Sequence, residues 1–144
     1  CNRFMIPIML VTHGDFARGI IDGAEMLVGK SEKLECVVLR PGDEFGVFQR
    51  RIAERVKELD EGEGVLLLAD LLGGSPYNAA ALTMEQGNIE CLTGLNMSML
   101  LTALDQRKYC NLSQLVAVSR EAGTSNIASV REKLLEQITD DEED

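Results

Sequence analysis

The 144-residue sequence lacks features that several classes of protein require. A single histidine excludes a metal site built from several histidines, so we expect no metal centre. The four cysteines show no C-x-x-C spacing, which argues against a zinc site or a dithiol redox motif. No apolar run approaches the roughly 20 residues of a membrane-spanning helix. The longest of these runs, residues 65–69, stops at Asp70.

Positive charge is also scarce in this chain. Fourteen Lys and Arg residues stand against 24 Asp and Glu residues, which gives a formal net charge of -10. A nucleic-acid-binding protein needs a basic patch, so we expect no nucleic-acid partner. The hydrophobic fraction of 45% and the charged fraction of 26% are typical of a globular protein, and the length fits one domain. We therefore expect a cytoplasmic protein.

Strand-like and helix-like patterns alternate along most of the chain. Apolar runs predict strands at residues 6–12, 34–39, 65–69 and 89–93. Apolar positions three and four residues apart predict helices at 16–28 and 45–59, and Asp43 is expected to cap the second of these. Further helices are expected from Pro76 to Gly87, with Ser75 as the cap, and from Asn96 to Leu104. Short connections of this kind predict an α/β fold with a mostly parallel sheet.

The pattern is less decisive beyond Asn111. Residues 112–118 fit a helix or a strand, residues 126–130 form a short and weakly apolar segment, and residues 131–138 look helical. No repeat or linker marks a second domain, so we assign residues 4–138 to one domain and residues 139–144 to a solvated acidic tail. We interpret residues 1–3 as vector-derived or as a truncated start, because no apolar segment of a signal peptide follows them.

The loops that follow the predicted strands are where chemistry is expected. In parallel sheets, ligands bind beyond the carboxyl ends of the strands, here residues 12–15, 40–43, 70–75 and 94–96. His13 lies in the first of these loops and at the start of a helix, whose free N–H groups suit phosphate. Imidazole is largely neutral at pH 7 and can act as a nucleophile.

A histidine nucleophile needs a carboxylate on its second ring nitrogen to fix the tautomer. Asp70 would lie beside His13 if the first and third strands are neighbours. Asp15 is a rival for this role, although its place just after Gly14 favours capping of the helix.

A glycine-rich loop follows Asp70. Gly73, Gly74 and Ser75 offer backbone N–H groups and a hydroxyl that can hold phosphoryl oxygens, although a simple turn and helix cap would have the same sequence. The chain has no G-x-x-x-x-G-K-[ST] motif, and no G-x-G-x-x-G follows the first strand. A hydrolase triad with Ser75 as nucleophile is disfavoured because Pro76 follows directly.

Together these loops resemble the mannose-family enzyme IIA of the bacterial phosphoenolpyruvate-dependent sugar phosphotransferase system. The matching segments are residues 12–14, 24–29, 40–42, 70–80 and 94–100, and the resemblance covers roughly residues 6–130. The Gly-Gly-Ser-Pro-aromatic-Asn stretch preceded by an aspartate is specific, whereas Thr-His-Gly alone is not. Ser98 stands where many members carry proline, but both residues suit the start of a helix.

The resemblance implies a phosphoryl-carrier function. His13 would accept a phosphoryl group on Nε2 from the histidine-containing phosphocarrier protein and pass it to enzyme IIB, with Asp70 holding Nδ1. No cofactor, metal or nucleotide is implied, and the membrane permease subunits that recognise the mannose-class sugar are served only indirectly. The residues expected to bind the phosphate are Thr12, Gly14, Gly73, Gly74 and Ser75.

The resemblance also implies a fold and an assembly. The fold is a three-layer α/β sandwich with about four mostly parallel strands in the order 2-1-3-4, and residues 126–130 would form an antiparallel strand exchanged in a homodimer. No alanine- and proline-rich linker or IIB domain is present, which favours a free-standing IIA subunit. The alternatives are a regulatory phosphoprotein or a dihydroxyacetone-kinase phosphoryl donor of the same fold, or a binding module with an inert His13.

Overall fold

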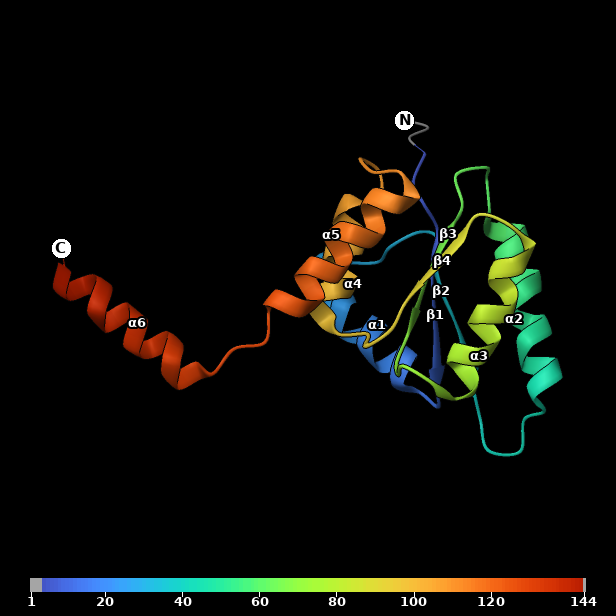
Figure 1. Ribbon diagram of the computed structural model, residues 1–144, viewed down its shortest axis with the longest axis horizontal. Helices are drawn as coiled ribbons and strands as arrows, with labels where there is room; N and C mark the ends of the chain where they lie inside the picture. Colours follow the sequence, from blue (N-terminus) through green and yellow to red (C-terminus); the bar gives the residue numbers. More distant parts are fainter. Residues whose placement is uncertain (1–3, 144) are drawn as a thin grey trace.

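The computed structural model describes residues 4–143, so the interpretation of residues 1–3 lies outside the described part. One sheet of four strands is flanked by helices on both faces (Figure 1). The strands are β1 (Ile8–His13), β2 (Leu34–Leu39), β3 (Val65–Ala69) and β4 (Ile89–Leu92). The helices are α1 (Phe16–Val28), α2 (Phe45–Leu59), α3 (Gly74–Thr83), the 3-10 turn η1 (Met84–Gln86), α4 (Met97–Gln106), α5 (Leu112–Ser125) and α6 (Val130–Glu143).

All four strands are parallel and lie in the order β2-β1-β3-β4. Ile8 at the start of β1 pairs with Leu34 on one side and with Leu66 on the other, so β1 and β3 are the two central strands. The α/β class, the parallel sheet and the strand order 2-1-3-4 are thereby confirmed.

Each face of the sheet has its own hydrophobic core. Helices α1, α4 and α5 cover one face, where Leu10 and Leu68 of the central strands are fully buried. Helices α2 and α3 cover the other face, where Phe48 and Ile52 of α2 pack on residues such as Leu67. Because both faces are covered, the central strands are almost continuously apolar, and this is why they were readable in the sequence.

Two helix starts are built differently from the prediction. Asp43 does not cap α2; its carboxylate accepts a hydrogen bond from the backbone N–H of Arg40 at 2.8 Å, and Glu44 stands at the cap position. Helix α3 begins at Gly74, one residue before the predicted serine cap, and Gly73 precedes it with φ of 103°. A left-handed conformation of this kind is open to glycine, so the chain turns into the helix earlier than expected.

Residues 112–118, which fitted helix or strand, lie in α5. Its first turn is a capping box, in which Asn111 Oδ1 accepts from the backbone N–H of Gln114 at 2.8 Å. The Gln114 side chain accepts in return from the backbone N–H of Asn111 at 2.9 Å. This reciprocal pair satisfies two backbone donors that a helix start otherwise leaves free.

The C-terminal region differs from the prediction in the single chain. Residues 127–129 have no regular structure and Val130 already begins α6, so residues 126–130 do not form a strand. Ile127 lines a cavity together with Cys91 and Leu92 of the edge strand β4, but the sheet of the described residues ends at β4 and does not include this segment. Exchange of this strand between two copies remains a prediction. Helix α6 also runs through residues 139–143, which therefore continue a helix rather than start a separate tail.

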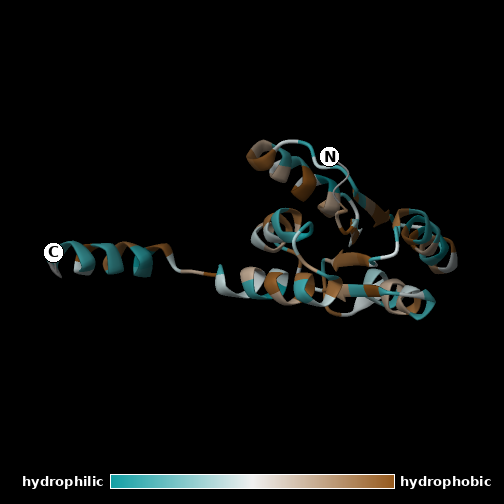
Figure 2. Ribbon diagram, turned by 90° about the horizontal axis from the view of Figure 1, so that it is seen from above, coloured by the Kyte–Doolittle hydropathy of each residue, from teal (hydrophilic) through white to brown (hydrophobic). Residues whose placement is uncertain are grey.

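Helix α6 stands apart from the sheet and its flanking helices (Figure 1). The same separation is seen from above, where α6 extends beyond the end of α5 (Figure 2). Among residues 4–143, no helix is long and apolar enough to cross a membrane.

Candidate functional site

After the two central strands, the chain continues to opposite faces of the sheet. The connection after β1 runs through α1 on one face, and the connection after β3 runs through α3 on the other. The two loops therefore diverge at the carboxyl ends of β1 and β3, which is the topological switch point where ligands bind in sheets of this kind. This end of the sheet lies opposite the N-terminus in Figure 1, and His13 and Asp70 are found here.

His13 and Asp70 form a close pair at this switch point. Asp70 Oδ2 accepts two hydrogen bonds from His13, one from Nδ1 and one from the backbone N–H, each at 2.9 Å. Because a carboxylate only accepts, this contact places the ring proton on Nδ1 and leaves the lone pair of Nε2 free. The His13 side chain is 49% exposed and that of Asp70 12% exposed, so the imidazole is half open to solvent while its partner is sheltered.

The second oxygen of Asp70 is not used by any other group. Oδ1 is buried and has no hydrogen-bond partner among the described residues. Within that part of the chain, the only ion-pair partner of the carboxylate is His13. The negative charge of Asp70 is therefore directed at the imidazole, where it favours any state in which the ring carries positive charge.

Asp15, the rival carboxylate, is engaged elsewhere. Its Oδ1 accepts from Arg40 Nη2 and lies 3.6 Å from Arg18 Nη1. Asp15 stands at the cap position of α1, but its side chain makes no capping hydrogen bond. The structure thus assigns the histidine contact to Asp70, and the expected capping role of Asp15 is not seen.

Thr12 takes over that capping role. Its side chain is fully buried, and Oγ1 accepts from the backbone N–H of Ala17 at 3.1 Å while donating to the Gly14 carbonyl at 3.4 Å. Gly14 has φ of 53°, and its N–H donates to the Leu39 carbonyl at 2.8 Å. Both residues thus hold the turn that presents His13, and their polar groups are already occupied by the protein itself.

The glycine loop reaches the free edge of the imidazole. A Cβ placed on Gly74, whose φ is 83°, would lie 3.4 Å from His13 Cε1 and 3.6 Å from Nε2. Gly74 and Ser75 open α3, where backbone N–H groups have no partner within the helix and carry partial positive charge. Pro76 follows as the third helical residue, where the missing N–H costs no intrahelical bond. A helix start beside Nε2 suits an anion bound there.

Exposed apolar side chains stand near the pair in the sequence, and they were not among the predicted site residues. Leu71 and Leu72 directly follow Asp70 and are exposed, as is Phe16 at the start of α1. Two leucines in a loop that is otherwise polar or glycine-rich were the available signal, because a loop seldom buries such residues. Apolar groups around an open reactive nitrogen are typical of a surface that contacts another protein.

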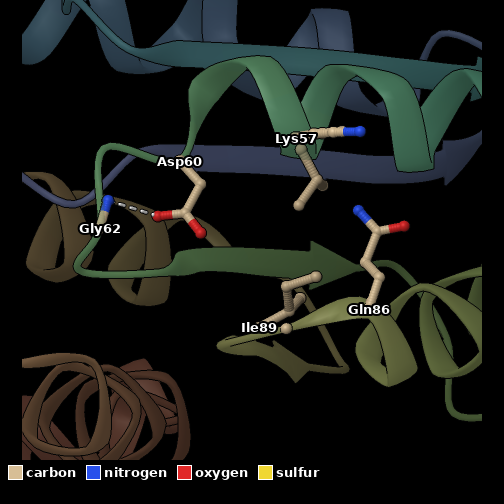
Figure 3. Close-up of a pocket in the computed structure, with 7 residues that line it drawn as sticks. Lys57, Asp60, Gly62, Gln86 and Ile89 are labelled. Carbon is tan, nitrogen blue, oxygen red and sulfur yellow. Dashed lines mark hydrogen bonds between the residues drawn. The ribbon is translucent and has the colours of Figure 1, made fainter.

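A separate pocket lies at the opposite end of the sheet (Figure 3). It has a volume of about 340 Å³ and is lined from α2, the α2–β3 loop and the start of β4. Its acidic residue, Asp60, accepts from the backbone N–H groups of Gly62 at 2.8 Å and Gly64 at 3.0 Å, so it serves the turn. Across residues 4–143, no group of three or more His, Cys, Asp or Glu side chains is placed to hold a metal ion.

The fold and the site define a class: a doubly wound α/β domain with a surface histidine, buttressed by an aspartate, at its topological switch point. A match to a known protein family identifies the family within this class. Residues 7–119 match the family model described as the fructose IIA component of the phosphotransferase system. The chain belongs to this mannose-type enzyme IIA family.

Known relatives agree with the family assignment. The chain is 31% identical over 134 residues to the mannose-specific EIIAB component of Escherichia coli, matching 92% of this chain but 42% of that protein. It is also 31% identical to the fructose-specific EIIA component of Bacillus subtilis, over 78% of this chain and 77% of the relative. The chain thus spans less than half of the EIIAB protein and most of the EIIA protein.

Solved structures share the fold. The EIIA component from Streptococcus agalactiae superposes with a TM-score of 0.82 at 30% identity, over 89% of this chain and 99% of that one. The IIA protein associated with the fucose utilization operon of Streptococcus pneumoniae gives a TM-score of 0.78 at 29% identity, over 93% and 99%.

Proposed function

We propose that this chain is the phosphoryl carrier of a sugar phosphotransferase system. His13 Nε2 accepts a phosphoryl group from the histidine-containing phosphocarrier protein and passes it to a histidine of enzyme IIB, for uptake of a mannose-class sugar. The observation that carries the proposal is the double hydrogen bond from His13 to Asp70 Oδ2, which in the neutral ring leaves the Nε2 lone pair free on a half-exposed side chain.

The transfer step is a displacement at phosphorus. The lone pair of His13 Nε2 forms the new P–N bond while the P–N bond to the donor histidine breaks, and its electron pair returns to the donor ring. No proton has to leave Nε2, because the ring proton is held on Nδ1 by Asp70. The positive charge that develops on the His13 ring lies next to the Asp70 carboxylate, so the product is stabilised electrostatically.

The phosphoryl oxygens need hydrogen-bond donors beside Nε2. The start of α3 supplies them, with the N–H groups of Gly74 and Ser75 and the Ser75 hydroxyl as the donors we propose. Gly73 lets the chain enter the helix there. Phosphoryl transfer of this kind depends mainly on positioning and charge stabilisation.

The surroundings of His13 favour proteins as donor and acceptor. His13 is half exposed, and Leu71, Leu72 and Phe16, which lie near Asp70 or His13 in the sequence, are exposed apolar side chains. The relatives named for mannose, fructose and sorbose systems support a mannose-class sugar as the final acceptor.

The test is phosphorylation of the chain with phosphoenolpyruvate, enzyme I and the phosphocarrier protein. Intact mass spectrometry should show one added phosphate that is lost in acid, as expected of a phosphohistidine. His13→Ala should remain unlabelled, and adding enzyme IIB should discharge the wild-type label. Label on His13→Ala would refute the assignment of the acceptor, and label that never reaches any IIB protein would favour a regulatory phosphoprotein.

A further inference from the structure

The side of the imidazole that carries Nε2 faces helix α3 of the same chain. Met9 and Val11 of β1 point into the core beneath α2 and α3, and His13 continues this alternation. Leu39, the register partner of His13, packs on the same core. Gly74 at the start of α3 stands beside the ring, because a Cβ there would lie 3.6 Å from Nε2. One chain therefore supplies both the nucleophile and the helix start beside it.

The start of α3 is open to an anion. Among the described residues, no side chain caps this helix, and its first turn carries no acidic residue. The backbone N–H groups of Gly74 and Ser75 therefore remain available for phosphoryl oxygens. The same place holds a nucleophile whose ring orientation is fixed by the 2.9 Å contact between His13 Nδ1 and Asp70 Oδ2. These parts are in place before any second protein binds.

The position beside Nε2 offers no proton to a leaving group. Gly74 has no side chain to donate one, and the hydrogen bond of the imidazole goes through Nδ1 to Asp70. Asp15, the nearest carboxylate in the sequence, is held by Arg40. A donor must therefore release a group that needs no proton from the protein.

This requirement separates the common phosphoryl donors by their chemistry. The alcohol of a phosphate ester departs as an alkoxide unless an acid protonates it. A phosphoramidate carries its proton on the bridging nitrogen, so its amine departs uncharged. Charge acts in the same direction, because that protonated nitrogen offsets the anionic phosphoryl group as the donor approaches a chain of net charge -10. Small phosphoramidates are therefore the donors that suit this site.

We propose that His13 also accepts a phosphoryl group directly from small phosphoramidates, without a partner protein. The inference rests on the proposed function, because it uses the same nucleophile. The lone pair of Nε2 forms the new P–N bond while the P–N bond of the donor breaks. The electron pair of that bond stays on the departing nitrogen, which already carries its proton and leaves as ammonia or an amine. The positive charge gained by the imidazole lies beside Asp70.

Two properties distinguish this reaction from the ordinary reactivity of an imidazole. Folded His13 should react at Nε2 alone, because Asp70 holds the proton on Nδ1, whereas N-acetylhistidine reacts at either nitrogen. Its rate should exceed that of N-acetylhistidine by at least about tenfold, because α3 and Asp70 stabilise the charges of the transition state. His13 is the only histidine of the chain, so both properties can be measured without interference.

The test uses the full chain, potassium phosphoramidate and no other protein. Intact mass spectrometry should show one added phosphate on the wild type and none on His13→Ala. NMR of the chain with isotope-labelled histidine should assign the phosphate to Nε2. N-acetylhistidine at the same donor concentration gives the reference rate. Phosphoenolpyruvate alone and glycerol phosphate, which are phosphate esters, should add no phosphate.

Two pairs of variants separate the site from general changes to the fold, and melting curves verify that all four variants fold. Asp70→Asn should slow labelling about 2- to 30-fold, as with the protein donor, while Asp15→Asn stays within about twofold. Gly74→Ala should slow labelling about tenfold, because its methyl group would lie beside Nε2 at an unfavourable φ. Gly19→Ala in α1 should match the wild type, since a Cβ there meets no atom within 4 Å.

Parallel loading from the phosphocarrier protein distinguishes this inference from the proposed function. Label from the phosphocarrier protein but none from phosphoramidate would overturn the inference alone, and label from neither donor would overturn both. Label from phosphoramidate alone would support the inference and contradict the carrier function. Labelling at the rate of N-acetylhistidine, or on Nδ1, would show that the site contributes nothing and would overturn the inference. Equal labelling by a phosphate ester would refute the argument from the leaving group.

Discussion

Replacement of Asp70 by asparagine is the sharpest perturbation of the candidate site. In the structure Oδ2 accepts from the His13 backbone N–H and from Nδ1, while Oδ1 has no partner. An asparagine can keep its carbonyl oxygen in the place of Oδ2 and put its amide group where no hydrogen bond is lost. The alternative orientation would oppose two donors and is disfavoured. Asp70→Asn therefore removes the negative charge and changes the geometry little.

The expected effect on rate follows from that lost charge. A hydrogen bond to a charged group contributes about 1.5–3 kcal/mol, compared with about 1 kcal/mol for a neutral pair. Each 1.4 kcal/mol added to the barrier slows a reaction about tenfold. Because the Asp70 side chain is only 12% exposed, solvent screens this contact little. The difference of about 0.5–2 kcal/mol predicts that phosphoryl transfer to His13 slows by about 2- to 30-fold.

Rapid-quench measurement of transfer from the phosphorylated phosphocarrier protein gives this rate. The melting temperature should fall by no more than about 4 °C, corresponding to about 1 kcal/mol, because the bond to the His13 backbone is retained. Asp15→Asn is the matched control: Asp15 is near in sequence but pairs with Arg40 instead of the imidazole, so its rate should stay within about twofold. Transfer by Asp70→Asn at the wild-type rate, or an equally slow Asp15→Asn, would refute the reasoning.

Three further predictions concern the loop, a thiol and the C-terminus. Gly74→Ala should reduce phosphorylation of His13 at least about tenfold in the same assay. The new methyl group would lie beside Nε2, at a φ that only glycine adopts easily. An unchanged rate would show that the space over Nε2 is not used. Burial raises the pKa of the Cys91 thiol to about 12, so at pH 8 Cys91 should resist iodoacetamide in the native protein and react once the chain is unfolded, as read by peptide mass spectrometry. Rapid native alkylation would contradict this. A chain ending at Ser125 should sediment as a monomer and still accept phosphate. It should aggregate more readily, because the edge of β4 stays unpaired. A stable dimer would show that the C-terminal region is not needed for assembly.

Much of the architecture was predictable because each strand or helix shows its buried side in the spacing of its own apolar residues. Residues 65–69 are continuously apolar because both faces of β3 are covered, and the helical spacing of Phe48, Ile52 and Val56 marks the buried side of α2. Residues 112–118 were ambiguous by periodicity alone. The capping box of Asn111 and Gln114 was already in the sequence and would have favoured the helix.

The features that were not predicted depend on contacts across the chain. The cap of α1 is the Thr12 hydroxyl and not Asp15, because Arg40 from another loop draws Asp15 away. Residues 126–130 were predicted as a strand, yet among the described residues of the single chain they do not join the sheet, whose edge is β4. His13 and Asp70 were found because each stands at the carboxyl end of a central strand, whereas Leu71 and Leu72 were overlooked although their place in a loop was a signal of exposure.

The two hydrogen bonds that converge on Asp70 Oδ2 have a consequence for kinetics. They hold the imidazole in one orientation, so His13 offers a single nitrogen to solvent. A donor and an acceptor that both react at this nitrogen cannot bind together, and each must leave before the other arrives. We therefore expect ping-pong kinetics for the carrier, with parallel lines in double-reciprocal plots. An excess of unphosphorylated acceptor should then slow loading by occupying the same surface.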